Sequence, residues 1–118
     1  MKHLWKVLSV LLALAMLPFA TASASESVKI GVIYTVAGLG GASFNDVIHE
    51  GCQRAEKELG ITYEYVEPST IADEETVMDE MCISGEYALI ICVGNEQKDA
   101  VSTVAANYPD QKFCYIDA

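Results

Sequence analysis

The chain is poor in several residue types and motifs, and each shortage argues against a class of function. It has seven lysines and arginines against 17 aspartates and glutamates, which argues against a nucleic-acid or anionic-membrane partner because both are polyanions. Histidine occurs only twice, and the cysteine spacings match no zinc pattern, so no metal centre is expected. The chain contains no G-K-[ST] motif for a phosphate loop. The excess of acidic residues is interpreted as a solvated surface.

The first 24 residues have the composition of an export signal. The segment begins with the charged residues Lys2 and Lys6, which are followed by the apolar run Val7–Leu17. Pro18 then breaks the run, and Ala22-Ser23-Ala24 supplies the small residues that cleavage requires. The apolar run is shorter than the ~20 residues that a membrane span needs, and no later segment approaches that length. No cysteine follows the run before Cys52, so no lipid anchor is expected. The sequence predicts a signal peptide at residues 1–24 and a soluble exported product, in the periplasm or at the cell surface.

The remaining 94 residues, 25–118, are enough for one small core. Hydrophobic periodicity predicts strands at 28–34, 61–66, 88–93 and 112–117 and helices at 43–59, 72–83 and 95–107. Four strands joined by three helices make three right-handed βαβ crossovers, which build a parallel sheet covered on both faces. The predicted fold class is therefore α/β, a doubly wound parallel sheet. Because the chain stops directly after a strand, we expect it to be truncated.

The four cysteines leave two interpretations open. They are Cys52, Cys82, Cys92 and Cys114. An even number in an exported chain is compatible with disulfides, in any of three connectivities. Two of them lie in apolar strand-like runs and two in helical patterns, however, which favours buried thiols that act as small hydrophobic residues.

The most informative segment, Val28–Asp46, combines a strand, a glycine loop and a capped helix. Ser43 and Asp46 stand at capping-box spacing, so the positive end of the helix dipole faces the loop. A corner of this kind is where open α/β sheets bind small molecules. Gly38, Gly40 and Ser43 approach the dinucleotide fingerprint, but its third glycine is missing, and the loop also lacks the final glycine of a nucleophile elbow. We therefore expect no enzyme and no cofactor, with a nicotinamide-dependent oxidoreductase as a remote alternative.

Several residues are expected at the carboxyl edge of the sheet, where a ligand would lie. Phe44 either fills the core or stacks on a ligand, and composition alone favours the core. Taken alone, Asn45 and Asp46 are better explained by their place at a helix start, whereas Asp117 either forms a turn or contacts a ligand. Because all of these residues are expected at the same edge of the sheet, together they predict a binding site. The candidate ligand-binding residues are Thr35, Phe44, Asn45, Asp46, Gly94, Asn95 and Asp117.

The sequence also resembles a known family. The blocks KIGVIYTVAGLGGASFND, VEPS, ALIICVGNEQKDAV and YPDQKFCYIDA are similar to the opening half-lobe of the basic membrane protein family, the substrate-binding proteins of ABC transporters that include purine nucleoside receptors. The resemblance covers Val28 to Ala118. It implies the N-terminal part of a type I periplasmic-binding-protein lobe, of which residues 25–118 would be a truncated portion.

The resemblance also implies roles for individual residues. Phe44 would stack on the base, Asn45 would hydrogen-bond the edge of the base, and Asp117 would take the ribose hydroxyls. Gly94 would let the third strand approach the ligand, and Thr35 stands where the family commonly has an aspartate. The implied function is the capture of a nucleoside, in particular a purine nucleoside, for uptake through an ABC permease and its ATPase. The alternative is an exported lobe of the same fold that senses a ligand for signalling.

Overall fold

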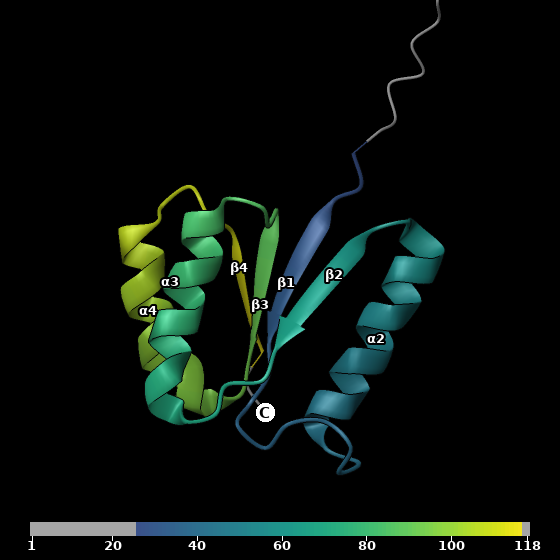
Figure 1. Cartoon of the computed structure of the whole chain (residues 1–118), viewed down its shortest axis with the longest axis horizontal. Coiled ribbons are helices and arrows are strands. Elements are labelled where there is room, and N and C mark those ends of the chain that lie inside the picture. The colour runs from purple at the N-terminus through teal and green to yellow at the C-terminus, as the bar shows by residue number, and fades with distance from the viewer. Residues whose placement is uncertain (1–25, 117–118) are drawn as a thin grey trace, which may run out of the picture.

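A computed structural model of the chain describes residues 26–116, and Figure 1 shows its elements in order. The predicted export signal and the predicted site residue Asp117 lie outside the described residues. Four strands alternate with three α-helices, and a one-turn 3₁₀ helix precedes two of the helices. The elements are β1 (Lys29–Ile33), α2 (Phe44–Leu59), β2 (Thr62–Val66), η1 (Ile71–Asp73), α3 (Glu74–Ser84), β3 (Leu89–Val93), η2 (Asn95–Gln97), α4 (Lys98–Asn107) and β4 (Phe113–Ile116).

The four strands form one parallel sheet in the order β2-β1-β3-β4. The prediction of a parallel α/β sheet is confirmed, and the wholly apolar β3 lies inside the sheet as expected. From β1 the chain passes to one side of the sheet and from β3 to the other, so the order reverses between these two strands. Such a reversal separates the loops that follow the two strands and leaves a crevice at their carboxyl ends.

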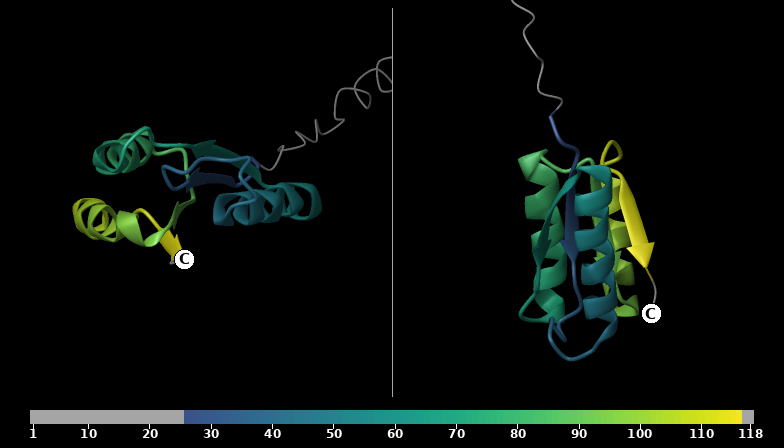
Figure 2. Two further views of the ribbon diagram at one scale, coloured as in Figure 1. Left: turned by 90° about the horizontal axis from the view of Figure 1, so that it is seen from below. Right: turned by 90° about the vertical axis from the view of Figure 1, so that its right-hand side faces the viewer.

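Helices cover both faces of the sheet (Figure 2). On one face α3 and α4 pack over a core that includes Ile33, Met78, Ile90, Cys92 and Val104, all fully buried. On the other face, α2 packs over a smaller core of Val32, Tyr34, Cys52 and Val93. Adjacent residues of β1 and β3 alternate between these two cores, as the pleat of a strand requires. The sheet is therefore doubly wound.

Local signals place the ends of α2 as predicted. The capping box of Ser43 and Asp46 is present at its start, and Gly60 ends it with a φ of 68°. A positive φ of this kind favours glycine because it lacks a Cβ. The other two helices begin two to three residues later than the periodicity predicts. Their first turns wind as η1 and η2 instead, and 3₁₀ turns are frequent at such termini.

All four cysteines are free thiols, but the expectation that every one is buried is wrong for Cys114. Cys52, Cys82 and Cys92 are buried, whereas Cys114 is exposed. Cys114 is paired in register with Ile91, which packs against the α2-side core. It therefore points to that face, and Figure 2 shows α2 along β1 and β2, away from β4. The apolar run around Cys114 thus predicted the strand correctly, but it did not show whether a helix covers that strand.

This difference between the thiols predicts selective chemical labelling. A thiol reagent added to the folded chain should modify Cys114 rapidly and the three buried cysteines slowly, whereas denatured chain should react at all four. Quantitative labelling followed by intact mass measures the number of groups. Cys114→Ser is the control and should remove the rapid reaction. Rapid modification of two or more thiols in the folded chain would contradict the burial of Cys52, Cys82 and Cys92.

Candidate functional site

The candidate site lies where β1 and β3 end, at the reversal of strand order. The loop after β1 and the glycine after β3 meet there. Gly94 has a φ of 94°, and a Cβ at this position would lie 2.6 Å from Cγ2 of Thr35. Its amide donates to the carbonyl oxygen of Ile116 at 2.9 Å. Thr35, Gly94 and the end of β4 are thereby held together, and the predicted residue Asp117 follows Ile116 directly in sequence.

Asn45 is buried beneath the glycine loop, with 1% of its surface exposed. Its Oδ1 accepts from the amide of Thr35 at 3.2 Å, and its Nδ2 donates to Oγ1 of Thr35 at 2.9 Å and to the carbonyl oxygen of Gly38 at 2.8 Å. The side-chain amide thus replaces hydrogen bonds that the turning loop cannot make within itself. In this structure Asn45 holds the loop, and its predicted hydrogen bond to a ligand stays a prediction.

Two carboxylates fix the remainder of the loop. Asp46 accepts from the amides of Gly40 and Ser43, each at 2.7 Å, and these main-chain donors hold the pKa of its carboxyl below the usual range. Glu67, after β2, accepts from the amide of Leu39 at 2.8 Å. The loop is therefore anchored from α2 and from the end of β2, although its own sequence, Thr35–Ser43, contains no charged residue.

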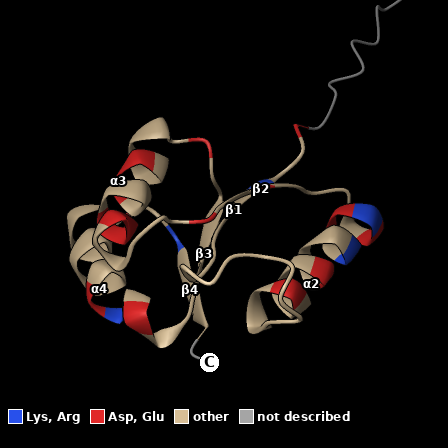
Figure 3. Ribbon diagram, turned by 60° about the horizontal axis from the view of Figure 1, so that its bottom comes forward, with Lys and Arg blue, Asp and Glu red and all other residues tan. Residues whose placement is uncertain are grey.

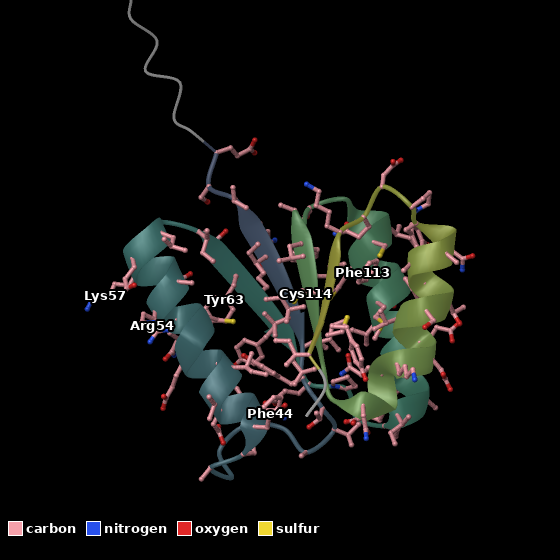
Figure 4. The ribbon with its side chains drawn as sticks, turned by 180° about the vertical axis from the view of Figure 1, so that it is seen from behind. Phe44, Arg54, Lys57, Tyr63, Phe113 and Cys114 are labelled. Atoms are coloured by element: carbon pink, nitrogen blue, oxygen red, sulfur yellow. The ribbon has the colours of Figure 1, made fainter. Side chains whose placement is uncertain are left out.

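Phe44 stands at the first position of α2, beside this loop (Figure 4). Its exposed fraction is 42%, so the core role that composition favours is not what the structure shows. A large aromatic ring left this exposed at the end of a binding loop offers a flat apolar face for stacking. The loop residue Val36 is exposed to the same extent.

Two residues at this edge were not predicted from the sequence. Gln97 is fully buried, and its Nε2 donates to the carbonyl oxygens of Ile33 at 3.3 Å and Tyr34 at 2.9 Å. Glu74, the first residue of α3, is 1% exposed, and its Oε1 has no hydrogen-bond partner among the described residues. Burial, aided by the charge of Glu96, raises the pKa of Glu74 to about 7. By contrast Asn95, which was predicted, is exposed at the start of η2.

The edge therefore offers an exposed aromatic ring beside a loop of small residues, and Asn45, Asp46 and Glu67 hold the main chain of that loop. Acidic residues are spread over α2, α3 and α4 (Figure 3), in keeping with the solvated surface expected from the sequence. Within residues 26–116, no group of three histidine, cysteine or acidic side chains is arranged to hold a metal ion. An open hollow of about 700 Å³ lined by Lys29, Thr62 and Glu86 lies at the opposite, amino edge of the strands and is not part of this site.

Comparisons with known proteins identify the family of this chain. Residues 27–118 match the Bmp family, described as ABC transporter substrate-binding protein PnrA-like. This chain belongs to that family. The fold class, the α/β sheet of a fragment of a periplasmic-binding-protein fold, is the one found in a solved solute-binding protein. The resemblance found in the sequence blocks is to the same family of ABC transporter substrate-binding proteins.

Individual relatives show how much of such a protein the chain represents. It is 38% identical to an uncharacterized lipoprotein of Pyrococcus abyssi over 83% of this chain and 24% of that protein. It is 39% identical to one of Pyrococcus furiosus, over 83% and 25%. A CD4+ T-cell-stimulating antigen of Listeria monocytogenes is 28% identical over 79% of this chain and 27% of the antigen. The chain thus spans about a quarter of the length of these relatives.

Solved structures support the same fold. An ABC transporter solute-binding protein of Aeropyrum pernix K1 superposes with a TM-score of 0.74 at 40% identity, over 77% of this chain and 25% of that chain. A lipoprotein fragment from Peptoclostridium difficile 630 gives a TM-score of 0.68 at 26% identity, over 75% and 72%. Across the part of this Bmp chain that the structure describes, no helix has the length and apolarity of a membrane span.

Proposed function

We propose that this chain forms part of the ligand-binding lobe of an exported receptor that captures a nucleoside, in particular a purine nucleoside, for an ABC permease and its ATPase. The observation that carries the proposal is the exposed ring of Phe44 beside the anchored glycine loop, at the reversal of strand order. Ligands of open α/β sheets bind at such a crevice. The receptor acts by binding and release rather than by catalysis, in the periplasm or at the cell surface.

In this proposal an aromatic side chain contacts the base of the ligand and a carboxylate contacts its sugar. Phe44 stacks on the base, which any purine satisfies because each presents a flat π-face. Asp117 accepts hydrogen bonds from the ribose hydroxyls, which a free base cannot supply. Gly94 allows close approach of the chain, and Thr35 and Asn95 line the same edge. Asp46 and Asn45 contribute by holding the loop, and Asn45 reaches the edge of the base if its amide exchanges one of its loop partners.

Replacing the aromatic ring tests the proposal. In a full-length receptor that contains this chain, purine nucleosides are expected to raise the melting temperature, because a ligand that binds only the folded state stabilises it by mass action. Phe44→Ala should abolish that shift while it leaves the melting temperature without ligand nearly unchanged, since the ring is 42% exposed. Differential scanning fluorimetry with a panel of nucleosides measures both quantities.

A neighbouring side chain supplies the matched control. Val47 lies on the same helix, one turn from Phe44, and is 66% exposed. Val47→Ala should keep the full nucleoside shift. If the Phe44→Ala receptor responds to purine nucleosides as strongly as the unmodified receptor, the stacking role is wrong.

A further inference from the structure

Gln97 has an unusual position for a polar side chain. It is fully buried at the end of η2, and its side-chain amide donates hydrogen bonds to main-chain carbonyl oxygens 63 and 64 residues earlier in the sequence. Both acceptors, the carbonyl oxygens of Ile33 and Tyr34, belong to the end of β1 and the residue after it. Its Oε1 has no partner among the described residues. The two hydrogen bonds of this side chain therefore link the segment after β3 to the end of β1.

Asn45 makes the complementary connection from the other side. It holds Thr35 and Gly38 from α2, whereas Gln97 holds Ile33 and Tyr34 from the segment that leads into α4. The chain from Ile33 to Gly38 thus passes between two buried amides on opposite faces of the sheet. A segment fixed at both faces has few alternative conformations, and pre-ordered loops bind with a smaller entropic cost.

We propose that Gln97 is a positioning residue of the ligand edge, which holds the end of β1 and the Gly94 turn in one preformed arrangement without touching the ligand. The expected effect of Gln97 on ligand binding rests on the proposed function, whereas its expected effect on the ligand-free chain does not. The two loops at the reversal of strand order then behave as one unit, and loss of the Gln97 amide uncouples them.

A second glutamine in the chain makes the same kind of contact elsewhere and provides a matched control. Nε2 of Gln111 donates to the carbonyl oxygens of Tyr87 at 3.1 Å and Lys112 at 3.0 Å. These acceptors lie just before β3 and β4, at the amino edge of the sheet. Replacing either glutamine with methionine removes a similar pair of hydrogen bonds and keeps a side chain of similar length. The two variants therefore differ mainly in which end of the sheet they affect.

Hydrogen–deuterium exchange of the ligand-free chain separates the two effects. The amides of Thr35 and Gly94 are hydrogen-bonded at the ligand edge, and those of Ala88 and Ile90 at the amino edge. Gln97→Met is expected to lower the protection factors of Thr35 and Gly94 about five- to tenfold, the equivalent of one net hydrogen bond, and to spare Ala88 and Ile90. Gln111→Met should show the reverse pattern.

A carboxyl in place of the amide provides a rescue test and a second variant. In Gln97→Glu the side chain lacks a donor when ionised but gains an O–H donor when protonated. Protection of Thr35 and Gly94 in this variant should therefore be low at pH 8 and partly restored at pH 5. In the full-length receptor, Gln97→Met should also weaken nucleoside binding about five- to tenfold while Gln111→Met does not.

Two results would overturn the inference. One is unchanged protection of Thr35 and Gly94 in both Gln97 variants. The other is an equal loss of protection at both edges, which would mean that Gln97 stabilises the fold as a whole rather than positions the edge. A receptor that binds no nucleoside would refute the proposed function and leave the exchange result to decide the role of Gln97.

Discussion

Gly94→Ala is expected to destabilise the chain by about 2–6 kcal/mol. Two costs combine. The residue has a φ of 94°, which costs an alanine about 1–3 kcal/mol. The new Cβ would also lie 2.6 Å from the Thr35 methyl and 2.7 Å from Oε2 of Glu96, and overpacking of this kind costs about 1–3 kcal/mol. Urea unfolding followed by circular dichroism measures the change.

The glycine loop supplies the control for this substitution. Gly41 has no positive φ, and a Cβ added there would meet no atom within 4 Å. Gly41→Ala should therefore change the free energy of unfolding by less than about 1 kcal/mol and can raise it, because alanine restricts the unfolded chain. Equal losses in the two variants would show that the contact between Gly94 and Thr35 is not what makes glycine necessary after β3.

Glu74→Gln is expected to stabilise the chain at neutral and alkaline pH by up to about 3 kcal/mol. Burial raises the pKa of this carboxyl from its ordinary 4.5 to about 7. The folded state therefore binds a proton more tightly than the unfolded state, and each unit of difference corresponds to about 1.4 kcal/mol. Below pH 4.5 both states are protonated and no penalty arises. The penalty grows as the pH rises from 4.5 to 7 and stays constant above that.

The difference between variant and parent isolates this carboxyl from the other titrating groups. Chemical denaturation at several pH values should show the parent losing stability relative to Glu74→Gln between pH 4.5 and 7.5. Glu75, the next residue of α3, is exposed, so Glu75→Gln should follow the parent throughout. Glu96→Gln should reduce the effect in part, because the charge of Glu96 contributes to the raised pKa. Parallel profiles for Glu74→Gln and the parent would mean that Glu74 is not buried as described.

Features set by neighbouring residues could be predicted from the sequence. The capping box of Ser43 and Asp46 and the glycine that ends α2 are local signals, and both are present. The apolar character of β3 also predicted its place inside the sheet, because only a strand with neighbours on both sides is buried over its full length. Thr35 and Gly94 were expected at one edge because parallel strands end together, and the structure brings them into contact.

Features that depend on distant partners could not be predicted in this way. Asn45 reads as a helix-start residue, and only the folded loop shows that its amide has four partners from Thr35 and Gly38. The acceptors of Gln97 lie more than 60 residues away in sequence. The burial of Glu74 and the exposure of Cys114 depend on which helix covers which strand. Hydrophobic periodicity describes one element at a time and carries no information about that arrangement.

The proposed nucleoside site is the edge that contains Phe44 and Gly94. Isothermal titration calorimetry of the full-length receptor tests it most directly, with purine nucleosides, the corresponding free bases and free ribose as separate titrants. We predict saturable binding of at least one purine nucleoside, with the base and the sugar each much weaker because each lacks half of the contacts. Binding of none of the nucleosides, or equal binding of ribose alone, would contradict the account.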